Sequence, residues 1–464
     1  MKNLLIVHFA IILLTSTTGA KTFNISDFGA TNDGATLNTS SIQKAIDTCN
    51  ESGGGTVMID GGGTYRTGTL YLKSYVTLHV ANGTILQGSP DYADYTTDTH
   101  KNMYRRETSM DRCLIFARDA TSIAIEGDGT IDGNGHIKNF KRSTRPMLLR
   151  FLNCSDLRLE NINLINPAGW TSAWLYCDNI DVDGITIVSR ANYNGDGLDF
   201  DGCTNVRVTN SNFDNSDDCI CLQTSRPDKP CKNVVITNNV FCTKWGGIRI
   251  GLLSRANIES VTVSNCIFRD IEDSGLKIQQ CEGGEMRNLS FSNLVMENVP
   301  RPIFMTFASQ RCCTDIPEGT YEPLKRMHNM MFDNIIVDNS QLDKNSAIIL
   351  TGMPDHKIED ISITNVQFIV SGGGTPEDAA KKDINEYTLD VLAGHWPEFR
   401  LLGTMPAYGI FARHMDGLTL DNISITTVEK DHRVPVILDD VAAESVGKIR
   451  ANGNLLQNSD IVRW

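Results

Sequence analysis

The sequence feature that most constrains the fold is a recurring eight-residue unit, apolar at alternate positions and with Asn or Gly at its fifth position. The first unit runs from Leu157 to Leu164. The first six units have their fifth positions at 161, 184, 210, 238, 265 and 293, so the gaps are 23, 26, 28, 27 and 28 residues. Fixed periods of this size are typical of stacked repeats. The units are 157–164, 180–187, 206–213, 234–241, 261–268, 289–296, 330–337, 361–368 and 418–425.

Each unit has the period-two alternation of a β-strand with one buried face, and its Asn or Gly tolerates the left-handed backbone of a turn. A period of about 25 residues without a recurring helical pattern favours a parallel β-helix over helical or leucine-rich repeats. The sequence therefore predicts an all-β solenoid. Ser40 and Gln43 have capping-box spacing and predict a short helix that caps the N-terminal coil.

The 464 residues fit one elongated domain, because a solenoid grows along one axis. We expect this domain to span 21–464, with loops inserted at 312–326 and 371–405. Residues 1–20 have the layout of a signal peptide, with a lysine, a short apolar run and small residues near Ala20. This predicts a secreted or periplasmic protein. A retained anchor is the weaker alternative, since the apolar run is short.

Thirteen cysteines are many for a cytosolic enzyme. We interpret them mainly as small core residues that stack between coils, and one or two disulfides are the alternative, with Cys312–Cys313 as the first candidate. No spacing of Cys and His fits a structural metal site. The net charge of −14 argues against nucleic acid as a partner. The four cysteines that follow the repeat are Cys154, Cys177, Cys203 and Cys231.

The candidate catalytic groups are Asp196 and, 21 residues later, the pair Asp217 and Asp218. Residues one coil apart lie roughly 4.8 Å from each other, so the repeat can bring these acids together. Crowded carboxyl groups separate their pKa values, and glycoside hydrolysis needs one protonated and one ionised carboxyl. The alternative is structural, because Asn215–Asp218 is also favourable turn chemistry. The apolar residues that follow at once favour a strand and a site beside it.

The motifs in their order resemble those of glycoside hydrolase family 28, the polygalacturonase and rhamnogalacturonan hydrolase family. The resemblance covers nearly the whole mature chain. It implies a right-handed parallel β-helix that hydrolyses α-linked acidic plant polysaccharide with inversion and without a cofactor or metal. The matching pieces are Asp27–Ala30, Thr130–Gly135, Arg145–Pro146, Asn166–Trp170 and the acidic groups.

The resemblance also assigns roles. The family's Asn-Thr-Asp motif corresponds to Asn194–Asp196, with Gly in place of Thr, and its Asp-Asp motif to Asp217 and Asp218. By resemblance, Asp217 is the general acid, while Asp196 and Asp218 hold and deprotonate the water. Asn194 is then a substrate-binding residue.

Two further motifs depart from the family pattern and bear on the substrate. Gly-His-Gly falls on Trp245–Gly247, followed by Arg249, and Arg-Ile-Lys falls on Lys277–Gln279, which retains one basic residue. Polygalacturonases use such basic residues near the substrate carboxylate. We therefore expect Trp245, Arg249, Lys277 and Gln279 to bind substrate and to change the sugar preference rather than abolish catalysis.

Two other functions remain open on sequence alone. A β-helix polysaccharide lyase would use calcium, for which Asp199 and Asp201 are candidate ligands, and Arg249 or Lys277 as its base. A non-catalytic carbohydrate-binding β-helix would stack sugars on exposed aromatic rings. We expect a monomer that acts on a pectin-like polysaccharide or its oligosaccharides. The aromatic candidates are Trp170, Trp174 and Trp245.

Overall fold

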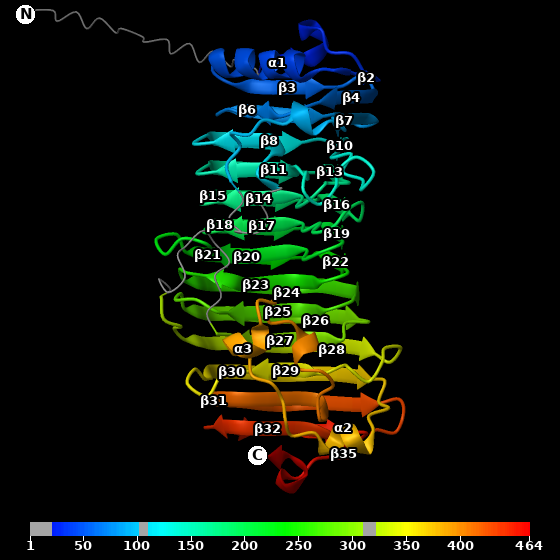
Figure 1. The fold of residues 1–464 in the computed structure, drawn as a ribbon, viewed down its shortest axis with the longest axis vertical. Helices are drawn as coiled ribbons and strands as arrows, with labels where there is room; N and C mark the ends of the chain where they lie inside the picture. The colour runs from blue at the N-terminus through cyan, green and yellow to red at the C-terminus, as the bar shows by residue number, and fades with distance from the viewer. Residues whose placement is uncertain (1–20, 102–109, 310–321) are drawn as a thin grey trace, which may run out of the picture.

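The computed structural model describes residues 21–101, 110–309 and 322–464. The signal peptide predicted for 1–20 and the candidate bridge Cys312–Cys313 lie outside these residues. The described chain winds into a right-handed parallel β-helix whose coils stack along one long axis, from the N-terminal to the C-terminal end (Figure 1). The predicted fold class is confirmed.

In the first half of the helix each full coil contributes three strands, and each strand pairs in parallel with its counterpart one coil on. Three columns of strands result. The first column is β1 (Thr22–Asn24), β3 (Gly55–Ile59), β6 (Val76–Val80), β9 (Thr121–Glu126), β12 (Ser155–Glu160), β15 (Asp178–Asp183), β18 (Thr204–Thr209) and β21 (Cys231–Thr237). The second is β2 (Asp33–Leu37), β4 (Gly63–Thr67), β7 (Thr84–Gly88), β10 (Thr130–Asp132), β13 (Asn163–Ile165), β16 (Thr186–Ser189), β19 (Asn212–Asn215) and β22 (Val240–Thr243).

The third column carries the candidate site. It is β5 (Leu70–Tyr71), β8 (Cys113–Arg118), β11 (Met147–Leu152), β14 (Ser172–Leu175), β17 (Leu198–Asp201), β20 (Ile220–Thr224), β23 (Gly246–Ser254), β25 (Ser274–Gln280), β27 (Arg301–Phe307) and β29 (Ile348–Thr351). Toward the C-terminus the first two columns merge into β24 (Ile258–Ile271), β26 (Met286–Glu297), β28 (Met327–Asn339) and β30 (Ile358–Val370). The last coils are β31 (Ala407–Thr427), β32 (Val434–Ala442), β33 (Ser445–Val446), β34 (Ile449–Ala451), β35 (Asn454–Leu455) and β36 (Val462–Arg463).

The register of the sheet matches the repeat in the sequence. The first residues of successive units, from Leu157 through Ile180 and Val206 to Leu418, are direct partners on neighbouring coils. The alternating apolar side chains of each unit point into the helix, where rings stack from coil to coil. Phe213 and Phe241 are stacked with centroids 5.1 Å apart, and Phe241 and Phe268 are 4.9 Å apart.

The fifth position of every repeat unit is a corner of the coil. All nine of these residues have a positive φ between 51° and 66°, as their Asn or Gly identity predicts. The asparagines also form a ladder along the outside of the helix, in which Nδ2 of Asn293 donates to Oδ1 of Asn265 at 3.1 Å and Nδ2 of Asn334 to Oδ1 of Asn293 at 2.8 Å. A second such ladder, which the repeat analysis missed, includes Asn233 and Asn205.

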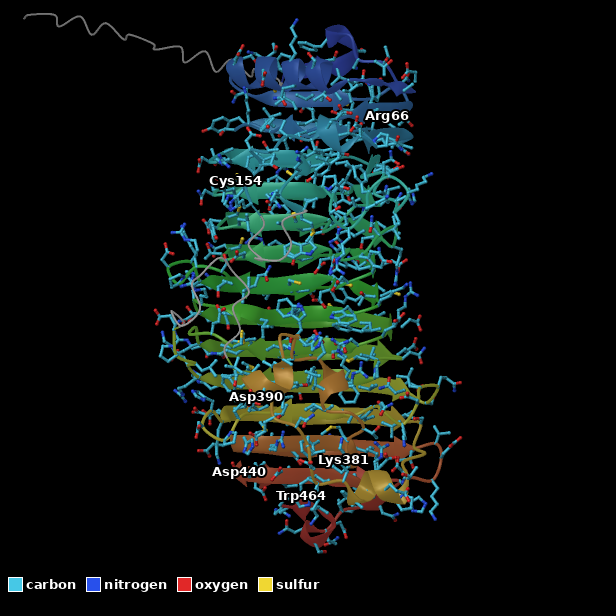
Figure 2. All side chains as sticks on the ribbon, viewed as in Figure 1. Arg66, Cys154, Lys381, Asp390, Asp440 and Trp464 are labelled. Carbon is cyan, nitrogen blue, oxygen red and sulfur yellow. The ribbon has the colours of Figure 1, made fainter. Side chains whose placement is uncertain are left out.

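Cysteines form part of the core, as predicted. Cys154, Cys177, Cys203 and Cys231 are buried, and none of the cysteines in the described residues forms a disulfide. Figure 2 shows Cys154 on the coil stack, away from both ends of the molecule. Thiols behave here as small apolar side chains.

The N-terminal coil is capped by α1 (Thr39–Glu51), which lies across the end of the stack (Figure 1). Its buried face includes Ile42 and Ile46, so the capping helix is confirmed. The capping box is wrong: the residue before the helix is Asn38 and not Ser40, so the helix begins at Thr39, two residues earlier than the box predicts. Gln43 instead exchanges hydrogen bonds with the backbone of Tyr71, accepting from its N–H at 2.8 Å and donating to its carbonyl at 3.1 Å. The Gln43 side chain therefore forms tertiary hydrogen bonds with β5 instead of a capping hydrogen bond at the start of its own helix.

The insertion at 371–405 covers the third column. It contains α2 (Pro376–Ala380), α3 (Leu389–Leu392) and η4 (Phe399–Leu401), and Figure 1 shows α3 beside β27 and α2 beside β32. Its apolar residues, such as Tyr387 and Leu392, pack with outward side chains of that column, such as Phe304. No described helix is long and apolar enough to cross a membrane. The remaining short helices are η1 (Ile25–Phe28), η2 (Tyr92–Asp94) and η5 (Asn458–Asp460).

Candidate active site

The predicted acids meet in a cavity of about 230 Å³ on the outer face of the third column. Strands β17, β20 and β23 form its floor, and the insertion contributes one wall. The cavity lining contains five of the eight residues predicted to catalyse or bind substrate, and a sixth, the buried Asp218, contacts the lining residue Arg249. The lining residues are Trp170, Asn194, Asp196, Asp199, Asp217, Cys221, Trp245, Arg249, Trp396 and Glu398.

The three predicted catalytic carboxyls converge from two neighbouring coils. One oxygen each of Asp196, Asp217 and Asp218 lies within 4.8 Å of the others. Asp196 precedes β17 and the other two precede β20, one coil further on. A tight turn makes this possible: a Cβ on Gly195 would lie 2.3 Å from the carbonyl oxygen of Ser189. The close packing explains why glycine stands where the family motif has threonine.

Asp218 is fully buried, and its carboxylate accepts hydrogen bonds from a backbone N–H and from a guanidinium. The N–H of Gly246 donates to its Oδ1 at 2.8 Å, and the Arg249 guanidinium donates to its Oδ2 at 3.1 Å. A Cβ at position 246 would come within 2.5 Å of the same Oδ1, so glycine is needed there. Charge-assisted donors of this kind fit an ionised carboxylate.

Asn194 orients the second acid of the group. Its Nδ2 lies 3.3 Å from Oδ2 of Asp217, while its Oδ1 accepts from the buried guanidinium of Arg145 at 2.9 Å. Because Arg145 holds the amide oxygen, the amide nitrogen must face Asp217. Arg145 was recognised in the sequence only as part of a motif, without this positioning role.

The cavity raises the pKa values of its acids. For Asp217 burial, and then repulsion from Asp218, raises the pKa to about 7. Burial raises the pKa of Asp196 well above its ordinary value, and the Asp217 carboxylate adds to the shift. Burial does the same for Asp199. The group therefore retains protons at mildly acidic pH, when an isolated aspartate has lost its own.

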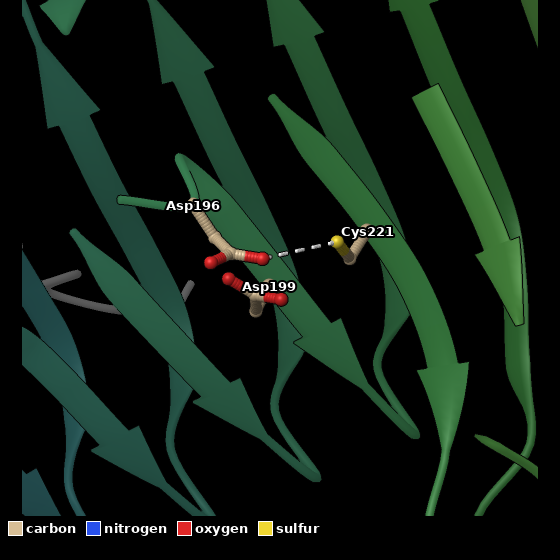
Figure 3. A group of neighbouring side chains, drawn as sticks. All are labelled: Asp196, Asp199 and Cys221. Atoms are coloured by element: carbon tan, nitrogen blue, oxygen red, sulfur yellow. Dashed lines mark hydrogen bonds between the residues drawn. The ribbon is translucent and has the colours of Figure 1, made fainter. Parts of the chain in front are cut away.

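Asp199 and Cys221 extend the acidic group along the column (Figure 3). The Cys221 Sγ lies 4.0 Å from Oδ2 of Asp196, and one ligand atom each of Asp196, Asp199 and Cys221 lies within 4.8 Å of the others. A thiol is a poor calcium ligand. Asp201, the other candidate calcium ligand, instead accepts hydrogen bonds from the backbone N–H and hydroxyl of Ser225. The two candidate calcium ligands, Asp199 and Asp201, therefore do not belong to one group of possible metal ligands among the described residues.

Asp199, Cys221, Arg249 and Lys277 occupy one register position on four successive coils. Lys277 was predicted to bind substrate, but it is fully buried behind the cavity lining, where its ammonium contacts Asp273 at 3.0 Å and Glu398. Gln279 is also fully buried and donates to the carbonyl of Pro397 at 2.7 Å. Neither residue lines the described cavity.

Among the predicted aromatic residues, two lie at the cavity and one does not. Trp245 is 36 % exposed at its rim, and Trp170 lines it. Trp174 is buried in the core and stacked on Phe151, with ring centroids 4.4 Å apart. Sugar stacking by Trp174 would require the core to open.

The sequence analysis missed the contribution of Trp396–Phe399, which we call the strap. Its Trp396 and Glu398 line the cavity, although they follow Arg249 by 147 (396 − 249) and 149 (398 − 249) residues. The Trp396 ring lies 5.1 Å from the Arg249 guanidinium carbon. The strap belongs to an insertion without repeat register, so periodicity could not place it. The equal spacing of Cys221, Arg249 and Lys277 could have identified Cys221.

A parallel β-helix with clustered acids and aromatic rings in an outer cleft defines a carbohydrate-active class of protein. The model for glycosyl hydrolases family 28 matches residues 76–387, more than half of the chain. The chain therefore belongs to glycosyl hydrolase family 28, and its enzyme class is glycoside hydrolase.

The names of similar proteins are consistent with membership of this family. The chain is 28 % identical over 408 residues to an exo-poly-α-D-galacturonosidase of Dickeya chrysanthemi, covering 74 % of this chain and 66 % of that enzyme. It is 26 % identical over 374 residues to a probable polygalacturonase of Vitis vinifera, covering 75 % and 74 %. A family 28 exopolygalacturonase of Yersinia enterocolitica shares the fold, with a TM-score of 0.70 at 22 % identity over 95 % of this chain and 79 % of that one.

Proposed function

We propose that this protein is a secreted, monomeric glycoside hydrolase that cleaves a glycosidic bond in a pectin-like polysaccharide, of galacturonan or rhamnogalacturonan type, or in its oligosaccharides. It would comprise a signal peptide at 1–20 and one β-helix domain at 21–464. The observation that carries this proposal is the convergence of Asp196, Asp217 and Asp218 within 4.8 Å at a cavity lined by tryptophans. Family membership and the polygalacturonase relatives support the substrate class.

In this proposal Asp217 is the general acid. Its pKa of about 7 keeps it protonated at mildly acidic pH, and Asn194 Nδ2 holds its Oδ2 in place. It donates this proton to the leaving glycosidic oxygen as the bond to the anomeric carbon breaks. General acid catalysis of this kind contributes roughly 10²–10⁴-fold to the rate.

Asp196 and Asp218 hold and deprotonate the attacking water. Asp196 Oδ1 has no hydrogen-bond partner among the described residues and so retains acceptor capacity for a water. The two donors on Asp218 favour the ionised form that accepts the proton. The water held at Asp196 attacks the anomeric carbon, its proton passes to the Asp218 carboxylate, and the product is a hemiacetal. Asn194, Trp245 and Arg249 would contact the sugar, with Lys277 and Gln279 supporting from behind.

Inversion at the anomeric carbon rests on family membership. One oxygen each of the three acids lies within 4.8 Å of the others, whereas the two carboxyl groups of an inverting enzyme typically lie roughly 6.5–9.5 Å apart. The first-formed anomer, observed by proton NMR before mutarotation, tests this step. A product that retains the substrate's configuration would contradict it.

Reducing-end release from a substrate panel tests the activity. The panel contains polygalacturonate, rhamnogalacturonan and neutral pectic side chains, with ultraviolet absorbance followed in parallel. We expect at least one substrate to be cleaved and Asp217→Asn to lower kcat by about 10²–10⁴-fold. Asp214→Asn, which removes an exposed carboxyl on the neighbouring strand β19, is the matched control and should keep full activity.

The same assay separates the alternatives. New ultraviolet absorbance that grows with cleavage would show the unsaturated product of a lyase. Tight binding without cleavage, and unchanged by Asp217→Asn, would show a carbohydrate-binding protein.

A further inference from the structure

The strap lies across the outer face of the third column, next to the catalytic group. Cys221 on β20, Arg249 on β23 and Lys277 on β25 occupy one register position of that face, one coil apart. The Trp396 ring lies 5.1 Å from the Arg249 guanidinium carbon, and the Glu398 carboxylate binds the Lys277 ammonium. Because coils lie roughly 4.8 Å apart, the strap begins to cover this face only one coil beyond β20.

Beyond Arg249 the outer face is closed by the insertion. Lys277 and Gln279 are fully buried, and Arg301 at the start of β27 is only 7 % exposed. Gln279 donates to the carbonyl of Pro397 at 2.7 Å, and the Phe399 ring lies 4.5 Å from the Arg301 guanidinium carbon. The strap therefore covers the third column over two successive coils, β25 and β27.

Side chains of the sheet and of the insertion hold the strap in this position. The Tyr387 hydroxyl donates to the Glu398 carbonyl at 3.1 Å, and Lys277 contacts Asp273 at 3.0 Å in addition to Glu398. Although burial tends to lower the pKa of Lys277, its two carboxylate partners raise it, so the ammonium stays charged. A buried charge that loses its partner is strongly unfavourable, so this ion pair fixes the strap against the sheet.

The cavity is thus a pocket with a closed end. Its lining follows the column from Trp170, before β14, through Asp217 to Trp245, before β23, and ends at the strap. Its volume of about 230 Å³ is below the roughly 300–1,000 Å³ of typical small-molecule pockets. The cavity has room for the end of a sugar chain, but not for a chain that continues past β25.

We propose that the strap restricts this protein to the ends of its polysaccharide chains, so that it is exo-acting and releases short terminal pieces. This inference rests on the proposed function, which it narrows to the position of the cleaved bond in the chain. A polymer along the column would meet Trp396 and Glu398 where its next units should lie, so steric clash excludes internal segments. A chain end has no further units and can insert between the acids and the strap.

Binding stoichiometry tests chain-end recognition without hydrolysis. The protein is the Asp217→Asn variant, and the probes are polygalacturonate and rhamnogalacturonan, each as a long polymer and as short oligosaccharides of known chain concentration. A protein that recognises ends binds the same number of copies per chain whatever the length, whereas binding to internal segments rises with length. Calorimetry should give the same molar ratio of protein to chains for the long and short forms of the polysaccharide that binds.

The products of the unaltered protein test the inference by a second route. On the polymer that is hydrolysed, we expect one class of short product from the first minutes, and a fall in viscosity that lags far behind the release of reducing ends. At equal mass the rate should fall in proportion to chain length, because longer chains offer fewer ends.

Removal of the blocking side chains should admit internal segments. Trp396→Ala with Glu398→Ala removes both strap side chains that line the cavity, and we expect the ratio of internal to terminal cleavage to rise by about tenfold. Trp396→Ala alone keeps the ion pair with Lys277 and provides a second test should the double variant misfold; the ratio should rise by a smaller factor. Leu389→Ala removes an exposed side chain of the same insertion and should leave the ratio unchanged.

Several outcomes would overturn the inference: early release of mixed oligosaccharides with an immediate fall in viscosity, a stoichiometry that rises with chain length, or a cleavage pattern that neither strap variant changes. Absence of hydrolysis of both polymers, with the same stoichiometry for long and short chains, would instead refute the proposed function and support chain-end recognition. Absence of both binding and hydrolysis would overturn both.

Discussion

At the scale of single residues, burial decides the chemistry of the acids. Asp199 and Asp201 lie on β17 of the third column, Asp196 and Asp217 lie directly before β17 and β20, and burial raises the pKa of each. Asp201 lies outside the cavity lining, where Ser225 partly offsets the effect by donating hydrogen bonds, and its pKa is about 7. A substitution of Asp201 therefore measures how a buried acid affects stability, because Asp201 does not line the cavity.

We predict that Asp201→Asn reduces the pH dependence of stability. The folded-state pKa is raised above 3.8, so the stabilisation is fully present below about 3.8 and is lost as pH rises through about 7. The shift corresponds to roughly 4 kcal/mol across that window. Asparagine can keep both contacts with Ser225 and has no proton to lose. Urea unfolding between pH 4 and pH 8 should show a smaller loss for the variant than for the wild type.

The control for this experiment is Asp228→Asn, which removes an exposed carboxyl paired with Arg226 nearby. It should leave the steep loss of stability with rising pH in place. Parallel stability curves for the wild type and Asp201→Asn would show that Asp201 does not carry a raised pKa.

At the scale of elements, the corners of the coils are specified by asparagine. Asn293 combines a φ of 55° with hydrogen bonds to the corner asparagines on both neighbouring coils. Asparagine at this position thus tolerates the left-handed backbone of the turn, and its side-chain amide also links neighbouring coils. The repeat in the sequence revealed the first role, while the ladder became visible only in the stacked structure.

We predict that Asn293→Ala lowers the free energy of unfolding by about 1–2 kcal/mol, because alanine is strained in the left-handed region. Asn293→Gly should lower it by less than about 1 kcal/mol, since glycine adopts this backbone freely and loses only exposed amide contacts. Thermal and urea unfolding of both variants measure the difference. Equal losses would mean that the ladder, and not the backbone, is the main contribution.

At the scale of the whole molecule, the stack has a helix over its N-terminal end and a site near its middle. Helix α1 covers the first coil, while the acids lie on β17 and β20 or directly before them, several coils away (Figure 1). In a solenoid each coil contacts mainly its neighbours, so stability is close to a sum of local terms. A destabilising substitution in α1 should therefore affect the first coils and leave the coils of the site unchanged.

We predict that Ile46→Ala, which truncates a fully buried side chain of α1, destabilises the cap by about 2–5 kcal/mol. Hydrogen–deuterium exchange should speed up in β3 and β6, with little change in β17 and β20 and nearly normal activity. Lys44→Ala, on the exposed side of the same helix, should change neither. Uniformly faster exchange along the whole chain would contradict local coupling and indicate one cooperative unit.

The sequence by itself determined the solenoid, the coil register, the corner asparagines and the convergence of Asp196 with Asp217 and Asp218. All of these follow from periodicity, because a repeating pattern converts spacing along the chain into neighbourhood across coils. The orienting role of Arg145 on Asn194 lay beyond this reasoning, since the two residues are brought together by side-chain packing.

Only the tertiary structure decided the electrostatics of the cavity. Lys277 resembles a substrate-binding cation in the sequence, yet Glu398, 121 residues later, binds it and lines the cavity in its place. The strap comes from an insertion that has no register with the repeat, so its position depends on packing against the outer face of the third column. Whether a charge is available to a ligand depends on its partners in space, and periodicity contains no information about them.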